Sequence, residues 1–525
     1  MAGAPASTPE CYRETVPLLL SCPSEATLSD ALPPVDNELG LSRLVLIRQE
    51  AWWLLTSSIP LSVSYFCQSS FTFASMLSVG KLGVNELAAA SLAVMLINFI
   101  VLMPCVGLAS ALETFCSSAF TASRDKTRVG FHLQRGLAAV TLQLLPIVVL
   151  FAYIDELLQK MGQTPEVSAL CGRFLRVWLI GSWPLVAFEC LKRFVQAQGI
   201  MQASTWVMAI VAPIHMYNSY ALVWSSTLGL GFIGAPLATA ISSWLMFILL
   251  VLYIAFSEAR AAWGGFSLSC FDGIWDFYCL AIPSAAMMAC SWAAFELVTF
   301  GSSIFGPVAL AAQACIFAAM SLTYQTPSAI GSAAATRVGN SLGQGKQRRA
   351  RYASYVSIAM GYLVGMLCSL LLFTNRHRWG YIFSNDVEVV TMCSTLMPYF
   401  AAVQTYDGMN GLVAGIMRAL GRQSLGAMLA FPSFWILAIP LGFYLGLGPL
   451  DLKVVGLWLG LAAGVIVYSL SQQCFILFYV DWRHEVKVCL DRLARCSNTK
   501  GSSAIGIADS HSASSVSIDS YGSVV

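Results

Sequence analysis

The sequence predicts an all-α integral membrane protein with twelve transmembrane helices in two six-helix lobes related by an internal repeat. The first observation is composition, because 57% of the 525 residues are apolar and only 11% are charged, against about a quarter charged in soluble domains. The second is a series of long apolar runs, and the third is a set of motifs that recurs in both halves. So few charges exclude a soluble enzyme, and the high hydrophobicity excludes a disordered chain.

Each apolar run is long enough to be a helical span, which needs about 20 apolar residues to cross roughly 30 Å of hydrocarbon. The spans must be helices because backbone groups in lipid need internal partners. Runs between charges and glycine or proline breaks predict spans at residues 53–79, 89–120, 133–154, 170–197, 204–226, 232–257, 277–304, 308–341, 352–374, 388–419, 427–446 and 454–480. Lysine and arginine are concentrated in alternate loops, which places both termini in the cytoplasm.

The spans divide the chain into two lobes between two tails. The predicted parts are a disordered cytoplasmic tail (1–45), a first lobe (46–260), a second lobe (261–482) and a serine-rich cytoplasmic tail (483–525). The first tail carries charges and no long apolar run, so no signal peptide is expected. Glu14, Leu18 and Leu19 fit an acidic-dileucine pattern read by sorting adaptors. The predicted membrane is therefore either the plasma membrane or a vacuolar or endolysosomal one.

The second lobe repeats motifs of the first with one slip in spacing. The matched pairs are Ile59-Pro60 with Ile282-Pro283 at an offset of 223, then Ser110-Ala111 with Ser332-Ala333 and Ala197-x-Gly199 with Ala419-x-Gly421 at an offset of 222. Six spans in each half give both halves the same topology, so an axis along the membrane normal relates them. Transporters commonly place the substrate site between two such halves, near the bilayer midplane.

Two carboxylates lie deep within predicted spans of the second lobe, Glu296 in span 7 and Asp407 in span 10. An ionisable group at that depth costs several kcal/mol and is a functional candidate by default. Buried carboxylates can change protonation state near neutral pH, which is the minimum chemistry for coupling proton entry to cation exit. The alternative is a carboxyl group that is hydrogen-bonded in the bundle and does not titrate. The repeat counterparts are Phe73 and Leu185, so the acids are confined to the second lobe.

Aromatic and polar side chains in the spans are the candidates for substrate contact, because aromatic faces attract organic cations. The alternative for each is packing or a hydrogen bond between helices. The predicted substrate-binding residues are Tyr65, Gln68, Asn98, Trp292, Phe295, Gln313, Tyr324, Gln325, Tyr406 and Asn410. Glu113 ends span 2, where a side chain can be buried but is more often expected to face the cytoplasmic interface. Glu189 is expected to pair with Lys192 and Arg193, three and four residues later.

Three segments resemble the span endings of eukaryotic multidrug and toxic compound extrusion (MATE) transporters. They are Ala109-Ser-Ala-Leu-Glu-Thr-Phe-Cys-Ser-Ser-Ala119, Ala334-Ala-Thr-Arg-Val-Gly-Asn-Ser-Leu-Gly-Gln-Gly345 and Met417-Arg-Ala-Leu-Gly-Arg-Gln423. The resemblance implies a V of two lobes and export of organic cations or secondary metabolites in exchange for protons, with Glu296 and Asp407 at acidic positions of the family. The repeat and these segments together give the structural-motif residues Pro60, Glu113, Pro283, Arg337, Gly339, Asn340, Gly343, Arg418 and Gly421.

The chain departs from many of these relatives at two acidic positions, where it has Ser291 and Ala318. The expected proton site is therefore a reduced pair, Glu296 and Asp407, and Na⁺ is a less favoured coupling ion. A flippase for lipid-linked saccharides is the related alternative, but it would need a basic central cavity. No HExxH or usable GxSxG motif supports an intramembrane enzyme. The 16 cysteines and five histidines lack metal-ligand spacing, and a net charge of +2 indicates no nucleic-acid partner.

Overall fold

The computed structural model describes residues 42–502 except Lys81, Arg124, Leu228, Gly273, Ser384 and Asn385. The acidic-dileucine pattern and the serine-rich segment after Ser502 lie outside the described residues. Seventeen α-helices make up almost all of the described part. Its fold class is the predicted one, with twelve spans in two lobes.

The first lobe contains spans 1 to 6. Its helices are α1 (Arg43–Val79), α2 (Val84–Leu96), α3 (Met103–Ala122), α4 (Thr127–Ala152), α5 (Ile154–Lys160), α6 (Pro165–Ala197), α7 (Gln202–Trp224) and α8 (Gly234–Phe256). Span 2 joins α2 and α3 through a π-helical segment, Ile97–Leu102. Span 1 begins at Arg43 and not at residue 53, because the polar segment before the apolar run is helical as well.

The second lobe contains spans 7 to 12 and a final helix. Its helices are α9 (Ile274–Ser303), α10 (Pro307–Gly343), α11 (Gln347–Thr374), α12 (Arg376–Trp379), α13 (Val387–Leu420), α14 (Gln423–Phe431), α15 (Ile439–Leu447), α16 (Lys453–Cys474) and α17 (Trp482–Ser502). A second π-helical segment, Pro432–Ala438, joins α14 to α15 in span 11. Helix α17 is an addition to the prediction, which expected only a cytoplasmic tail after the last span.

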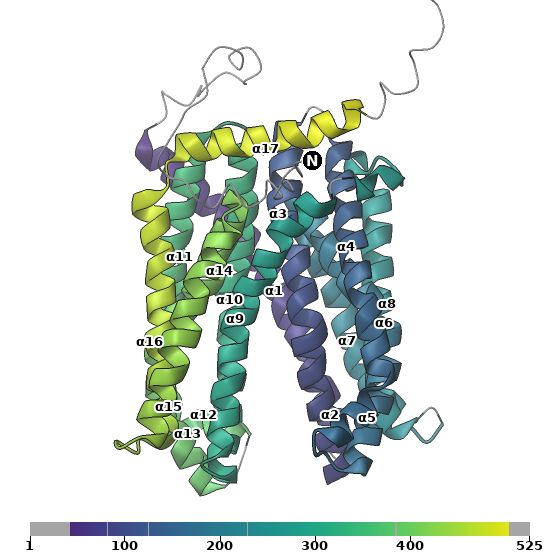
Figure 1. Ribbon diagram of the computed structural model, residues 1–525, viewed down its shortest axis with the longest axis vertical. Helices are drawn as coiled ribbons and strands as arrows, with labels where there is room; N and C mark the ends of the chain where they lie inside the picture. Colours follow the sequence, from purple (N-terminus) through teal and green to yellow (C-terminus); the bar gives the residue numbers. More distant parts are fainter. Residues whose placement is uncertain are drawn as a thin grey trace, which may run out of the picture.

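Ten helical stretches of the described residues are long and apolar enough to cross a membrane, and α1 and α13 complete the twelve. α13 is less apolar because it carries Gln404, Asp407 and Asn410 in its middle. Figure 1 shows the helices before and after residue 260 as two bundles, which converge beside α17 and diverge toward α5 and α12. The convergent end is called the α17 end below.

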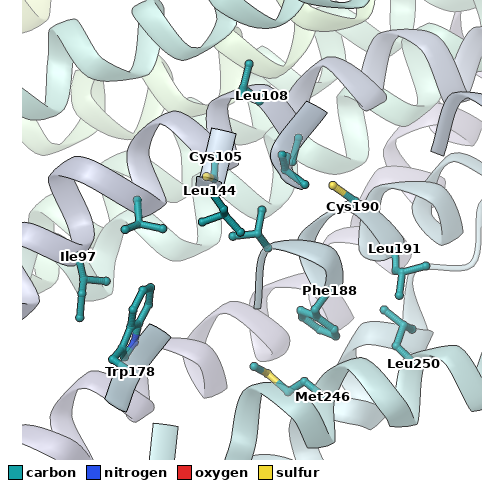
Figure 2. Close-up of a cluster of buried hydrophobic side chains, with 14 of the residues drawn as sticks. Ile97, Cys105, Leu108, Leu144, Trp178, Phe188, Cys190, Leu191, Met246 and Leu250 are labelled. Atoms are coloured by element: carbon teal, nitrogen blue, oxygen red, sulfur yellow. The ribbon is translucent and has the colours of Figure 1, made fainter. Parts of the chain in front are cut away.

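Three hydrophobic clusters hold the bundles. One fills the first lobe and includes Ile97, Trp178 and Phe188 (Figure 2), and a second fills the outer part of the second lobe. A third joins Leu54 and Leu61 of α1 to α10, α11, α13 and α17. The start of α9 correspondingly joins the first-lobe cluster. The first helix of each half therefore packs against both lobes, as an internal repeat requires.

The two lobes meet where α3 crosses α10. Gly339 lies against Ser117 and Gly343 lies against Thr121, and both pairs are separated by the repeat offset of 222. The Thr121 hydroxyl donates to the Asn340 carbonyl at 2.8 Å. Because each residue contacts its own repeat counterpart, the crossing lies on the pseudo-twofold axis. A side chain at either glycine would force α3 and α10 apart.

Candidate functional site

Asp407 is the buried acid at the centre of span 10. Its side chain is 5% exposed, and Oδ2 has no hydrogen-bond partner among the described residues. Gln404 and Asn410 lie three residues before and after it, and each also has a buried side-chain atom without a partner. A spacing of three places such residues on neighbouring positions of a helix surface. The middle of α13 therefore presents a polar stripe whose hydrogen-bonding capacity is not used by the described residues.

α10 and α16 face this part of the second lobe with further polar groups. The Tyr324 hydroxyl of α10 lies against Gly411, one turn after Asp407, and Pro327 lies against Gly408. Tyr324 interacts electrostatically with Asp407. On α16, both amide atoms of Gln472 are buried without a partner. Buried polar groups are normally hydrogen-bonded, so this cluster has the composition of a binding site and not of a packed core.

Glu296 is half-buried on α9, next to the buried Phe295 and one turn after the exposed Trp292. Helices α10 and α16 both pack against α9 and α13. The two predicted acids therefore lie in the same lobe, and α10 and α16 each contact both of the helices that carry them. No hydrogen bond or ion pair of the described residues joins Glu296 to Asp407.

Three other predicted substrate contacts in the spans have defined surroundings. Tyr406 makes an edge-to-face contact with Tyr362 at 6.5 Å. The Gln313 amide is held at both ends, because its oxygen accepts from Trp458 Nε1 at 2.8 Å and its nitrogen donates to Thr299. Asn98 lies half-buried in the π-helical segment of span 2, in the first lobe. Both ends of the Gln313 amide are therefore used in hydrogen bonds between helices of the bundle.

Tyr65, Gln68 and Gln325 lie apart from the acids, where α1 meets other helices. The Tyr65 hydroxyl lies 2.8 Å from the Ser332 hydroxyl of α10. Gln68 donates to Glu189 at 3.1 Å, and Gln325 donates to the Ser69 hydroxyl of α1 at 2.8 Å. Tyr65 and Gln325 thus lie where α1 meets α10 between the lobes, Gln68 and Asn98 lie in the first lobe, and the other predicted binding residues lie inside the second lobe.

The expected position of Glu113 at the cytoplasmic interface is wrong, because its side chain is only 4% exposed. Its carboxylate bridges Arg193 of α6 and Arg418 of α13, with 2.7 Å to each guanidinium. Two buried cations explain why the carboxylate is drawn inward. Glu189 pairs with Lys192 at 2.7 Å as expected, whereas Arg193, its other expected partner, forms its ion pair with Glu113. Glu113 therefore connects the two lobes at the α17 end.

A second ion pair connects the lobes near the same end. The Glu50 carboxylate of α1 is fully buried and accepts two hydrogen bonds from Arg337, at 2.6 and 2.7 Å. The sequence reading missed Glu50 because it lies before the predicted start of span 1. The motif residue Gly421 ends α13 with a φ of 73°, in the left-handed region that favours glycine.

The fold and these contacts define a class: a multi-span membrane protein whose two repeat-related lobes are joined at one end by buried ion pairs and whose two candidate acids, Glu296 and Asp407, lie in the second lobe. The family model described as MatE matches residues 60–221 and 283–444, one match in each half. The chain belongs to this family and is a eukaryotic MATE transporter.

Individual relatives agree with this assignment. The chain is 34% identical to an uncharacterized transporter of Schizosaccharomyces pombe, over 86% of this chain and 84% of that one. It is 32% identical to multidrug and toxin extrusion protein 1 of Xenopus tropicalis, over 88% and 80%. The crystal structure of the eukaryotic MATE transporter AtDTX14 aligns with a TM-score of 0.78 and 27% identity, over 85% of this chain and 99% of that one.

Proposed function

We propose that this transporter exports organic cations, among them xenobiotics and secondary metabolites, in exchange for protons. The observation that carries the proposal is Asp407, a buried carboxylate with a free oxygen inside a cluster of unsatisfied polar groups. A buried carboxylate is costly as an unpaired charge, so in such a place it should bind either a proton or a cation. Multidrug and toxin extrusion relatives support the substrate class.

Exchange follows from competition for this carboxylate. From the divergent end of the lobes, a proton binds Asp407 or Glu296 and removes the charge that holds the substrate cation. The cation leaves, the lobes rock, and the acids release their protons on the other side. Protonation shifts the populations of the two states only through a difference in affinity between them. Asn410, Tyr406 and Trp292 are then candidates for the substrate's polar and aromatic contacts.

The α17 end is the proposed cytoplasmic end. Lys126 and Arg128 lie at the start of α4, Arg348 and Arg351 at the start of α11, and Arg483 at the start of α17. An excess of lysine and arginine marks cytoplasmic loops. Export then takes up protons from the extracytoplasmic side, at either the plasma membrane or an acidic vacuolar membrane.

Proton flux in proteoliposomes that contain a pH dye tests the coupling. An imposed pH gradient first makes the vesicle interior acidic. We expect the addition of ethidium, an aromatic cation, to cause proton efflux from these vesicles. Asp407→Asn and Glu296→Gln should each abolish this ethidium-dependent proton efflux. Glu388→Gln is the matched control, because Glu388 is an acid in the exposed first turn of α13. Ethidium movement with unchanged proton flux in both variants would refute the coupling site.

Two alternatives have their own outcomes in the same vesicles. Ethidium movement driven by a Na⁺ gradient and insensitive to pH would indicate a Na⁺-coupled exporter. Translocation of a lipid-linked saccharide without ethidium movement would indicate the flippase. The latter is less favoured by the contacts, since Lys192, Arg193 and Arg418 already have acidic partners.

A further inference from the structure

Helix α17 is firmly attached to the second lobe. It follows α16 directly, and Trp482 at its start is buried in the third cluster. The Glu485 carboxylate accepts from Arg422, which follows α13, at 2.7 Å. The Arg492 guanidinium lies against Gly421. The buried residues Trp482, Glu485 and Cys489 recur at helical spacing, so one face of α17 covers the end of this lobe.

The same helix also contacts the first lobe. The Cys489 thiol lies next to the Ser118 hydroxyl of α3, and α17 packs against α3 as well as α10 and α11. Leu493 packs against the first-lobe cluster and the third cluster together. Figure 1 shows α17 running across the convergent ends of both bundles. Among the described residues, one helix thus covers the lobe boundary at the end that must open.

We propose that α17 is a strap that holds the cytoplasmic ends of the two lobes together and leaves the first lobe each time that end opens. The proposal rests on the proposed function only in requiring the lobes to rock. It does not depend on the substrate or the coupling ion.

The contacts of α17 with each lobe indicate which lobe it leaves when the lobes separate. The second lobe holds α17 through the chain itself, a buried tryptophan and an ion pair with a largely buried carboxylate. The first lobe holds it through the contact between the Cys489 thiol and Ser118 and through part of one leucine. A thiol is a weak hydrogen-bond donor and a weak acceptor. When α3 separates from α10, α17 therefore stays with the second lobe, and the contacts of Cys489 and Leu493 with the first lobe break.

Cys489 is a natural reporter of this release. It is 5% exposed, and burial raises its pKa from 9.0 to about 11. Release exposes the thiol and lowers its pKa toward the ordinary value, so a larger fraction of Cys489 is the reactive thiolate. N-ethylmaleimide labelling of the full-length protein, read by peptide mass spectrometry, measures this reactivity.

The strap predicts a specific effect of truncating Leu493. Leu493→Ala removes a partly buried contact with the first lobe and is expected to accelerate Cys489 labelling about tenfold. Leu490→Ala is the matched control, because Leu490 lies in the same helix but belongs to none of the clusters. Equal labelling rates in the two variants would show that α17 does not hold the first lobe.

A disulfide across the contact gives the decisive test. Because the Cys489 thiol lies next to Ser118, Ser118→Cys places two thiols close together, and oxidation with copper phenanthroline should join α17 to α3. We expect the joined protein to stop transporting ethidium and to show slower hydrogen exchange in 332–343 of α10. Dithiothreitol should restore both. Ser118→Cys combined with Cys489→Ser cannot form the bond and is the control.

The hydrogen-exchange readout separates this proposal from the proposed function. If complete cross-linking leaves exchange in 332–343 unchanged, the strap is wrong even if ethidium is not a substrate. If exchange slows while no cation moves protons in the uncross-linked protein, the strap holds and the proposed coupling fails.

Discussion

Replacing Glu113 by glutamine should destabilise the protein more than any exposed charge substitution. The carboxylate is 4% exposed and lies 2.7 Å from both Arg193 and Arg418. Glutamine has a similar shape but presents an amide N–H₂ to one of two buried guanidinium groups. Hydrogen bonds to charged groups contribute about 1.5–3 kcal/mol each, and breaking a buried ion pair costs about 3–5 kcal/mol. Because one buried guanidinium is left without its partner, the second figure applies, and the expected loss is about 4 kcal/mol.

Thermal unfolding in detergent measures this loss. An unfolding entropy of about 2.1 cal/mol/K per residue over 525 residues converts about 4 kcal/mol into a fall in Tm of about 4 °C. Asp155→Asn is the control, because the Asp155–Arg176 pair has exposed fractions of 29% and 40%. Such a pair contributes about 0–1 kcal/mol, so its Tm should change by no more than about 1 °C.

A double variant tests the physical cause. Arg418→Met in the Glu113→Gln background removes one of the unpaired cations, and part of the lost stability should return. Equal melting temperatures for Glu113→Gln and Asp155→Asn would refute the reasoning. The reasoning would also be refuted if the double variant were less stable than Glu113→Gln by as much as Arg418→Met alone destabilises the wild-type protein.

Three further outcomes are expected. Asp407→Asn should keep or raise Tm while abolishing proton flux, because the Asp407 Oδ2 atom has no hydrogen-bond partner to lose among the described residues. Gln313→Leu should lower Tm by about 1–3 °C through the lost Trp458 bond and leave the apparent KM for ethidium unchanged; a raised KM would assign Gln313 to the substrate. The Arg176 hydrogen bond lowers the pKa of Asp155 below its ordinary value of about 3.9. The contribution of the Asp155–Arg176 pair to Tm should therefore be constant from pH 8 to 5 and disappear only as the pH falls through that lowered pKa. A loss already at pH 6 would contradict this.

The spans and the repeat could be predicted because both are local or periodic signals. Apolar runs of about 20 residues define a span regardless of what surrounds them. The same reasoning missed α17, since its residues are mostly polar and its apolar face is narrow, with Trp482, Val486, Cys489 and Leu493 at helical spacing. A search for helical periodicity in the segment after the last span would have detected it.

The position of Glu113 could not be predicted for a different reason. Its partners are Arg193 and Arg418, 80 and 305 residues further along the chain. An acid at the end of a span faces water unless a cation on another helix is buried beside it, and only the packing of the lobes determines that. Glu50 was missed because it lies before the predicted start of span 1, and its partner Arg337 is 287 residues distant.

The repeat is preserved in the lobe contacts and lost in the interior. Ser110 and Ser332 are counterparts at the offset of 222, and each forms a hydrogen bond to the first helix of the other half: Ser110 with Ser284 at 2.6 Å and Ser332 with Tyr65 at 2.8 Å. Asp407, by contrast, has Leu185 as its counterpart. Symmetric contacts suit a rocking of both lobes about one axis. In the proposed exchange, the location of Glu296 and Asp407 in one lobe would give that motion a single place where proton and substrate compete. If equivalent acids were present in both lobes, substrate and proton could occupy separate sites at the same time, and the proposed coupling would be lost.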